Sequence, residues 1–252
     1  TEEVPTAWME VDVSAAGGMF FSAISGRGEA GVKVDGNEIG STTFLHTVGS
    51  GPCSALTAGA ETMPVSYSVE QTAEGWTDSV QIPWLAFSAA DAFSAELSSI
   101  ATAPPRDWRI NFYRTNFFDY GQHNPADFYA WRPTVPAGHG AAFHKPKNFG
   151  TMRLLNPSAP PLPPPPPPPP PEMEVLVPHC AKTGQPEQWG VVEDLLSCDG
   201  ATPAAEATTI RMCWTSVYLR VESVAVDSQV ISGQPNCGDS TWNGDSLEIF
   251  IA

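Results

Sequence analysis

The chain has 252 residues, of which 28 are acidic and 12 are basic, and its formal net charge at pH 7 is −16. A surface with this excess of negative charge repels phosphate groups, which excludes nucleic acid as an expected partner and argues against anionic membranes. No run of about 18 apolar residues occurs, so no transmembrane helix is expected.

The first 158 residues contain a series of predicted short β-strands. Apolar side chains take every second position in 7–14, 65–71, 108–114 and 150–155, which is the period of a half-buried strand. Clusters of Gly, Pro, Ser and Ala separate these segments. The one segment with helical character, 85–100, is short.

A proline-rich segment, 159–172, divides the chain. Proline has no backbone N–H and a fixed φ, so this segment cannot join a helix or the centre of a sheet and is predicted to form a polyproline II rod. At about 3.1 Å per residue, positions 160–171 span roughly 37 Å. The rod suits either a docking site for a PxxP reader or a hydroxylated, glycosylated stalk, and the lack of a flanking basic residue favours the stalk. Glycans on hydroxyproline are then expected at Pro163, Pro164, Pro165, Pro166, Pro167, Pro168, Pro169, Pro170 and Pro171.

Strand patterns return after the rod. The segment 209–226 alternates in two runs with a bend expected at Thr215 and Ser216. Val217, Leu219 and Val221 are expected on the apolar face of the second run, followed by Val224 and Val226. The last strand, 246–251, alternates through Leu247, Ile249 and Ile251, and turn residues precede it. Many short strands separated by turns predict an all-β fold, an antiparallel β-sandwich or jelly roll, with a polyproline II rod.

The cysteines indicate an oxidising, extracellular environment. None of the five forms a CxxC pair, so a metal knuckle is not expected and disulfides are the favoured interpretation over scattered buried thiols. One cysteine must be left over or pair with another chain, and the pairing cannot be read from the sequence. No signal peptide is visible at the start, so a targeting segment is expected to be removed or to lie outside these residues. The disulfide candidates are Cys53, Cys180, Cys198, Cys213 and Cys237.

Motifs for catalysis and cofactors are missing. The histidines are scattered, and no HExxH, GxSxG, P-loop or GxGxxG occurs, so the chain is not expected to be an enzyme. No organic cofactor is expected. Calcium is the one possible ion, because Asp239 and Asp245 lie near Glu248 in an acidic turn whose oxygens suit a hard cation.

Six segments together resemble the family 9 carbohydrate-binding module and its non-catalytic relatives. The matching residues are Trp214, Tyr218 and Leu219; Trp242, Asp245, Glu248 and Phe250; Gly75, Trp76, Ile82, Pro83 and Trp84; Trp108, Arg109, Ile110, Asn111, Phe112 and Arg114; Tyr129, Ala130 and Trp131; and Phe143, His144, Pro146, Phe149 and Gly150. The resemblance implies a β-sandwich of carbohydrate-binding ancestry.

A sugar site follows from the same resemblance. By motif position, Trp131 and Trp242 would stack on sugar rings, and Glu248 and Arg114 would hold the hydroxyl groups. The alternative for each tryptophan is that it caps the sandwich core at the end of a strand.

The order of the segments differs from the family pattern. The segments at 188–252 come first in the family and those at 1–155 come second, so the two parts of the domain are exchanged along this chain. The division implied is 1–158 as the C-terminal-type part of a sandwich, 159–172 as the linker and 173–252 as the N-terminal-type part. Three explanations fit: a circular permutant, one repeat of a longer polymer, or a subunit whose final strands complete the next subunit.

The expected function is therefore structural. Residues 173–252 are predicted to complete the domain with 1–158 of the same copy or, preferably, of a neighbouring copy, and the rod would hold successive sandwiches apart. Such a polymer suits a secreted wall, matrix or surface-filament glycoprotein, and the rod resembles those of algal hydroxyproline-rich glycoproteins. The expected partners are copies of the chain and glycans. The alternative is a non-catalytic carbohydrate-binding module of a secreted polysaccharide-degrading enzyme.

Overall fold

The computed structural model describes residues 7–25, 32–34, 37–39, 42–43, 46–48, 53, 55–58, 61–64, 66–88, 107–117, 126–134, 148–155, 173–181, 188–232, 235–238, 241 and 243–252. The expected polyproline rod, the proline glycosylation sites at 163–171, Trp242 and Asp239 lie outside these residues. Within the described part of the chain, the one helix is α1 (Trp84–Ser88). The rest of the helix expected at 85–100 also falls outside it.

The larger of two main sheets has β19 near its centre. Its strand order is β14-β13-β11-β19-β1-β2-β5. In addition, β12 pairs with β11 and β16 pairs with β12, and every pair is antiparallel except β13 with β14. The strands are β1 (Ala7–Ser14), β2 (Met19–Ser25), β5 (Thr42–Thr43), β11 (Asp107–Phe117), β12 (Ala126–Ala130), β13 (Gly150–Leu154), β14 (Glu174–Val177), β16 (Leu196–Ser197) and β19 (Ser246–Ile251).

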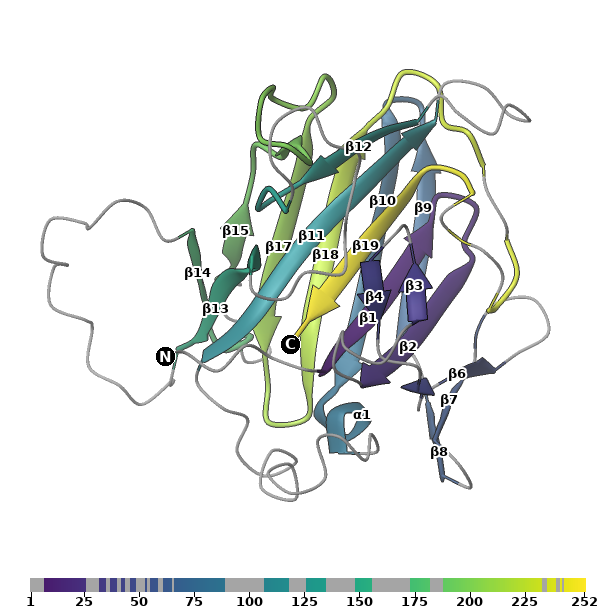
Figure 1. Ribbon diagram of the computed structural model, residues 1–252, viewed down its shortest axis with the longest axis vertical. Coiled ribbons are helices and arrows are strands. Elements are labelled where there is room, and N and C mark those ends of the chain that lie inside the picture. The colour runs from purple at the N-terminus through teal and green to yellow at the C-terminus, as the bar shows by residue number, and fades with distance from the viewer. Residues whose placement is uncertain are drawn as a thin grey trace, which may run out of the picture.

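A five-stranded antiparallel sheet with the order β15-β17-β18-β10-β9 lies behind the larger sheet (Figure 1). Its strands are β9 (Ser66–Thr72), β10 (Gly75–Pro83), β15 (Gly190–Val192), β17 (Thr208–Trp214) and β18 (Tyr218–Val226). Two small sheets are formed by β3 (Val32–Val34) and β4 (Asn37–Ile39), and by β6 (His46–Val48), β7 (Ala55–Ala58) and β8 (Glu61–Pro64). The prediction of an all-β, antiparallel sandwich is confirmed.

The core lies between the two main sheets. Alternate residues of β1, β11 and β19 point into it and meet alternate residues of β10, β17 and β18. Val11, Ile249, Val80 and Val221 are examples, all with 1% or less of their surface exposed. Burial of these side chains, at about 25 cal/mol per Å² of apolar surface, is the main favourable contribution to folding.

The prediction for β18 was partly wrong. The bend at Thr215 and Ser216 separates β17 from β18, as expected. However, Val217, Val224 and Val226 are exposed, at 63%, 45% and 46%. Leu219 and Val221 are buried, as expected, and the alternation that they begin buries Ser223 and Ala225, so Val224 and Val226 lie on the opposite, exposed face. Val217 precedes β18 and is not part of its alternation.

Both main sheets combine strands from the two sides of the proline-rich segment. Residues 173–252 supply β14, β16 and β19 to the larger sheet, and residues 1–158 supply β9 and β10 to the smaller one. The two parts therefore form one interleaved core within a single chain. Exchange of these parts between neighbouring copies stays a prediction.

The hairpin between β9 and β10 depends on glycine at position 75. Its φ is +144°, and a Cβ there would meet the carbonyl oxygen of Ala225 and lie 2.8 Å from the amide nitrogen of Asp227. We expect Gly75→Ala to lower the free energy of unfolding, measured with urea, by roughly 2 kcal/mol or more. Gly17→Ala is the control, because Gly17 has φ +89° but nothing within 4 Å of the added Cβ. Equal losses in the two variants would contradict a role for the close approach at Gly75.

Candidate functional site

Strand β19 joins the two parts of the chain along its whole length. It pairs with β1 from Ser14↔Ser246 to Met9↔Ile251 and with β11 from Thr115↔Ser246 to Ile110↔Ile251. The backbone of Ala252 extends the second ladder with two hydrogen bonds to Arg109, at 2.8 and 2.9 Å. Such a central strand has both edges paired, so its removal would leave two open edges in the core sheet.

Arg114 ties the same two parts together through a buried polar network. It lies on the strand face of Ile110 and Phe112 and is 0% exposed. Its Nη2 donates to Asp227 Oδ2 at 3.1 Å and to Glu206 Oε2 at 3.3 Å, and its Nη1 donates to Thr208 Oγ1 at 3.0 Å. One side chain from β11 therefore holds the ends of β17 and β18.

Asp245 fixes the entry to β19. Its Oδ1 accepts a hydrogen bond from the amide of Phe117 at 2.7 Å, and its Oδ2 accepts one from the amide of Ile231. Burial raises the pKa of Asp245 to about 7, although these hydrogen bonds oppose the shift. The carboxylate expected to bind calcium is thus engaged by the backbone. Among the residues that the structure describes, no group of three His, Cys, Asp or Glu side chains is arranged to hold a metal ion.

Two of the predicted sugar-site residues, Arg114 and Glu248, do not converge, and Trp242 lies outside the described residues. Arg114 lies on the inner face of the larger sheet, whereas Glu248 lies on its outer face and accepts a hydrogen bond from Thr115 Oγ1 at 3.0 Å. Trp131 is 5% exposed, has its ring 6.1 Å from that of Phe112 and covers Gly150. Its indole therefore has no free face for a sugar ring, and it occupies the core position that was the alternative for this residue.

The outer face of β1 carries a buried carboxylate that the sequence pattern did not single out. Asp12 is 0% exposed and lies opposite Glu248, and its carboxylate oxygens make no hydrogen bond of ordinary geometry, although the Thr241 side chain is close enough to lower the pKa of the carboxyl group. Burial, together with the charges of Glu10 and Glu248, raises its pKa well above the usual value. Asp12 is therefore expected to retain its proton in the folded protein at pH values where a surface aspartate is ionised.

Two disulfides are formed, and their pairing could not be predicted. Cys53 bonds to Cys237 across 184 positions, which links the two parts of the chain covalently. Cys180 bonds to Cys213 within the second part, across 33 positions. Cys198 is a free, buried thiol. Disulfides of this kind indicate an oxidising environment.

Cys198 should be unreactive until the protein unfolds. Burial, with smaller contributions from the charges of Glu248 and Asp199, raises the pKa of its thiol to about 12, so the reactive thiolate is scarce at neutral pH. We expect a thiol reagent to modify no cysteine in the folded protein and Cys198 alone after unfolding without reductant. Cys198→Ala is the control and should show no reaction in either state. Rapid labelling of the folded protein would contradict the burial.

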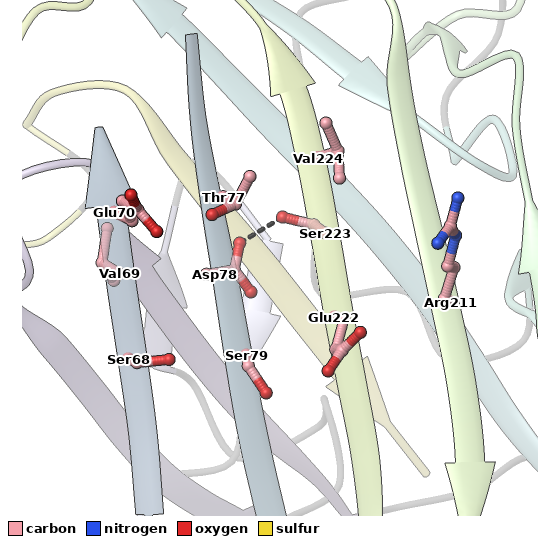
Figure 2. Close-up of a pocket in the computed structure, with 10 residues that line it drawn as sticks. All are labelled: Ser68, Val69, Glu70, Thr77, Asp78, Ser79, Arg211, Glu222, Ser223 and Val224. Atoms are coloured by element: carbon pink, nitrogen blue, oxygen red, sulfur yellow. Dashed lines mark hydrogen bonds between the residues drawn. The ribbon is translucent and has the colours of Figure 1, made fainter. Parts of the chain in front are cut away.

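A shallow hollow lies on the outer face of the five-stranded sheet, away from the predicted residues. It has a volume of about 570 Å³ and extends over β9, β10, β18 and β17, as Figure 2 shows. Ser68, Ser79, Glu222 and Arg211 follow one another across the four strands in register. The hollow depends on the alignment of strands far apart in sequence, so no local motif could reveal it.

Beneath this sheet, on its inner side, lies a buried pair. Asp78 is opposite Ser223 across β10 and β18 and accepts a hydrogen bond from the Ser223 hydroxyl (Figure 2). Both residues share the strand face of core residues such as Val80 and Val221. Burial raises the pKa of Asp78 to about 7, the hydrogen bond from Ser223 lowers it, and the charge of Glu222 raises it.

In the described segments, no helix has the length and apolar character needed to cross a membrane. Comparison with known proteins found no matching family, no matching curated protein and no matching solved structure. The resemblance to the family 9 module accordingly stays a prediction from the residues.

Proposed function

We propose that the chain is a non-catalytic structural unit of an extracellular assembly, in which residues 173–252 of one copy complete the sandwich with residues 1–158 of the next. The observation that carries this proposal is the interleaving of strands from both sides of the proline-rich segment in both main sheets. Two parts that share one core are complementary surfaces, and complementary parts can pair between copies as well as within one.

The position of the strands beside the proline-rich segment supports exchange between copies. Strands β13 and β14 pair in parallel, with Thr151 opposite Glu174. Met173 therefore lies opposite position 150, which is five residues before Leu155 along the direction of both strands. At about 3.3 Å per residue, the connection between Leu155 and Met173 has to bridge roughly 17 Å. The predicted rod, roughly 37 Å long if it is stiff, suits a connection to another copy better than a return over this short gap.

The disulfides give the proposed assembly a covalent consequence. If the two parts come from different copies, the Cys53–Cys237 bond joins neighbouring copies, whereas the Cys180–Cys213 bond remains within one copy. Oxidation of the two thiols would pass two electrons and two protons to a disulfide-bearing oxidant of the secretory compartment. The assembled protein would then be a covalent chain of units.

Electron microscopy and a non-reducing gel test this proposal on the secreted protein. We expect fibres, and a ladder of SDS-resistant multimers that collapses to one band with reductant. The paired variant Cys53→Ser/Cys237→Ser should abolish the ladder, and the matched control Cys180→Ser/Cys213→Ser should retain it. Monodisperse particles in the microscope together with a single band on the non-reducing gel would contradict the assembly.

A further inference from the structure

We infer that the hollow on the outer face of the five-stranded sheet binds a neutral, hydroxyl-rich glycan chain. The floor of the hollow is formed by short side chains, because Ser79 of β10 lies opposite Ser68 of β9 and next to Thr77 along its own strand face. Longer side chains, those of Glu70, Glu222 and Arg211, surround this floor (Figure 2). Small residues between large ones on a twisted sheet leave the observed depression of about 570 Å³, a volume typical of ligand sites.

The polar groups of the hollow are largely free to meet a ligand. In the part of the chain that the structure describes, the hydroxyls of Ser68, Thr77 and Ser79 make no hydrogen bond, and Arg211 and Glu70 make no ion pair. Glu222 is bonded to Arg220 of its own strand, and the Arg220 guanidinium lies 5.4 Å from the centre of the Trp189 ring. This contact orients the Glu222 carboxylate over β18, between Ser79 and Arg211.

The chemistry of the hollow selects for a neutral polyol. Serine and threonine hydroxyls both donate and accept hydrogen bonds, carboxylates accept them, and the Arg211 guanidinium donates them. Sugar hydroxyls can complement all three kinds of group. An anionic chain would meet Glu70 and Glu222, against the single cation Arg211, within an already acidic protein of net charge −16, so charge disfavours it.

The dimensions suit a chain rather than a single small molecule. Four strands at about 4.8 Å spacing extend the polar surface over roughly 14 Å. The hollow is open to solvent, its contacts are polar, and Val224 is its most exposed apolar side chain. Affinity per unit should therefore be weak, with a Kd of roughly 1 mM or somewhat tighter. Retention of the protein on a wall or matrix would then rest on the proposed function, because a polymer of such units makes many weak glycan contacts at once and gains affinity by avidity.

A matched pair of leucine substitutions tests the site. Ser66 and Ser68 both project from the exposed face of β9, but Ser68 lines the hollow and Ser66 does not. Ser68→Leu fills the floor, and Ser66→Leu makes the same chemical change two residues away. Affinity electrophoresis and NMR titration should use a soluble neutral β-glucan, a neutral galactomannan and an anionic polygalacturonate.

At least one neutral polysaccharide should retard the protein and shift resonances of β9, β10 and β18. Ser68→Leu should weaken this binding tenfold or more, Ser66→Leu should stay within twofold, and 0.5 M salt should have little effect because no ion pair forms with the ligand. Absence of binding to both neutral chains, equal losses in the two variants, or binding to polygalacturonate alone would overturn the inference. Assembly into fibres does not use the hollow, so the two proposals can fail separately. If Ser68→Leu still forms fibres but no longer binds glycan, the proposed function stands. If fibres are lost while glycan binding is retained, the inference about the hollow stands.

Discussion

Replacement of Arg114 by methionine should lower the free energy of unfolding by about 3–5 kcal/mol. The guanidinium is the buried partner of Asp227, at 3.1 Å, and of Glu206, at 3.3 Å, with exposed fractions of 0% for Arg114, 2% for Asp227 and 19% for Glu206. Methionine matches much of the side-chain volume but leaves two carboxylates without their cation, and an uncompensated buried charge is the main cost. Urea unfolding followed by tryptophan fluorescence measures the change.

Two further variants separate the ion pair from general damage. Arg211→Met removes an exposed arginine from the same sandwich and should change stability by no more than about 0.5 kcal/mol. Arg114→Met/Asp227→Asn removes both charges of the closest pair and should recover part of the loss, because contacting residues are energetically coupled. A loss below about 1 kcal/mol in Arg114→Met would show that the network does not hold the two parts of the chain together.

The second large effect concerns pH. Burial raises the pKa of Asp78 to about 7, whereas an aspartate in an unfolded chain titrates near 3.9. Between these values the folded protein binds more protons than the unfolded chain, so this group favours folding below about pH 4, and its contribution is lost as pH rises towards 7. A shift of about three units corresponds to roughly 4 kcal/mol, as an upper limit for one group.

Between pH 4 and pH 8, the free energy of unfolding should therefore fall less in Asp78→Asn than in the parent protein, by up to roughly 4 kcal/mol, as measured by urea unfolding across that range. Asparagine cannot ionise, and it keeps an oxygen for the hydrogen bond from Ser223. Ser223→Ala should act in the opposite direction and steepen the pH dependence, because the hydrogen bond from Ser223 lowers the pKa of Asp78. Identical pH profiles for Asp78→Asn and the parent protein would refute the assignment.

Local pattern was sufficient to predict the fold class but not the site. Alternation in 7–14, 108–114 and 246–251 identified strands, because a side-chain period of two is a property of the strand itself. The relation between Arg114 and Glu248 depends on the register of β11 with β19, in which Glu248 lies opposite Tyr113 rather than Arg114. The family motif assigns Arg114 and Glu248 to one site, whereas the register of β11 with β19 places their side chains on opposite faces of the sheet.

The same limit explains the disulfides and the burial of Trp131. Cys53 and Cys237 meet because Cys53 lies close to Met19 of β2, with Sγ 3.0 Å from its carbonyl oxygen, and the amide of Gly238 bonds to that same oxygen at 3.0 Å. These are tertiary contacts, and the spacing of the cysteines in the sequence does not predict them. Trp131 sits among polar and turn residues in sequence, yet its backbone bonds to Phe112 and its indole closes the end of the core.

The origin of the two halves of the Cys53–Cys237 bond tests the central claim most directly. Chains labelled with ¹⁵N and unlabelled chains would be mixed, reduced, unfolded and reoxidised together with oxidised glutathione, and the disulfide-linked peptides would be analysed by mass spectrometry. Exchange between copies predicts peptide pairs with one labelled and one unlabelled half at Cys53–Cys237, in the proportion expected for random mixing, whereas Cys180–Cys213 pairs should remain uniformly labelled or unlabelled. Uniform labelling of both disulfides would contradict the account, because each sandwich would then be completed by its own chain.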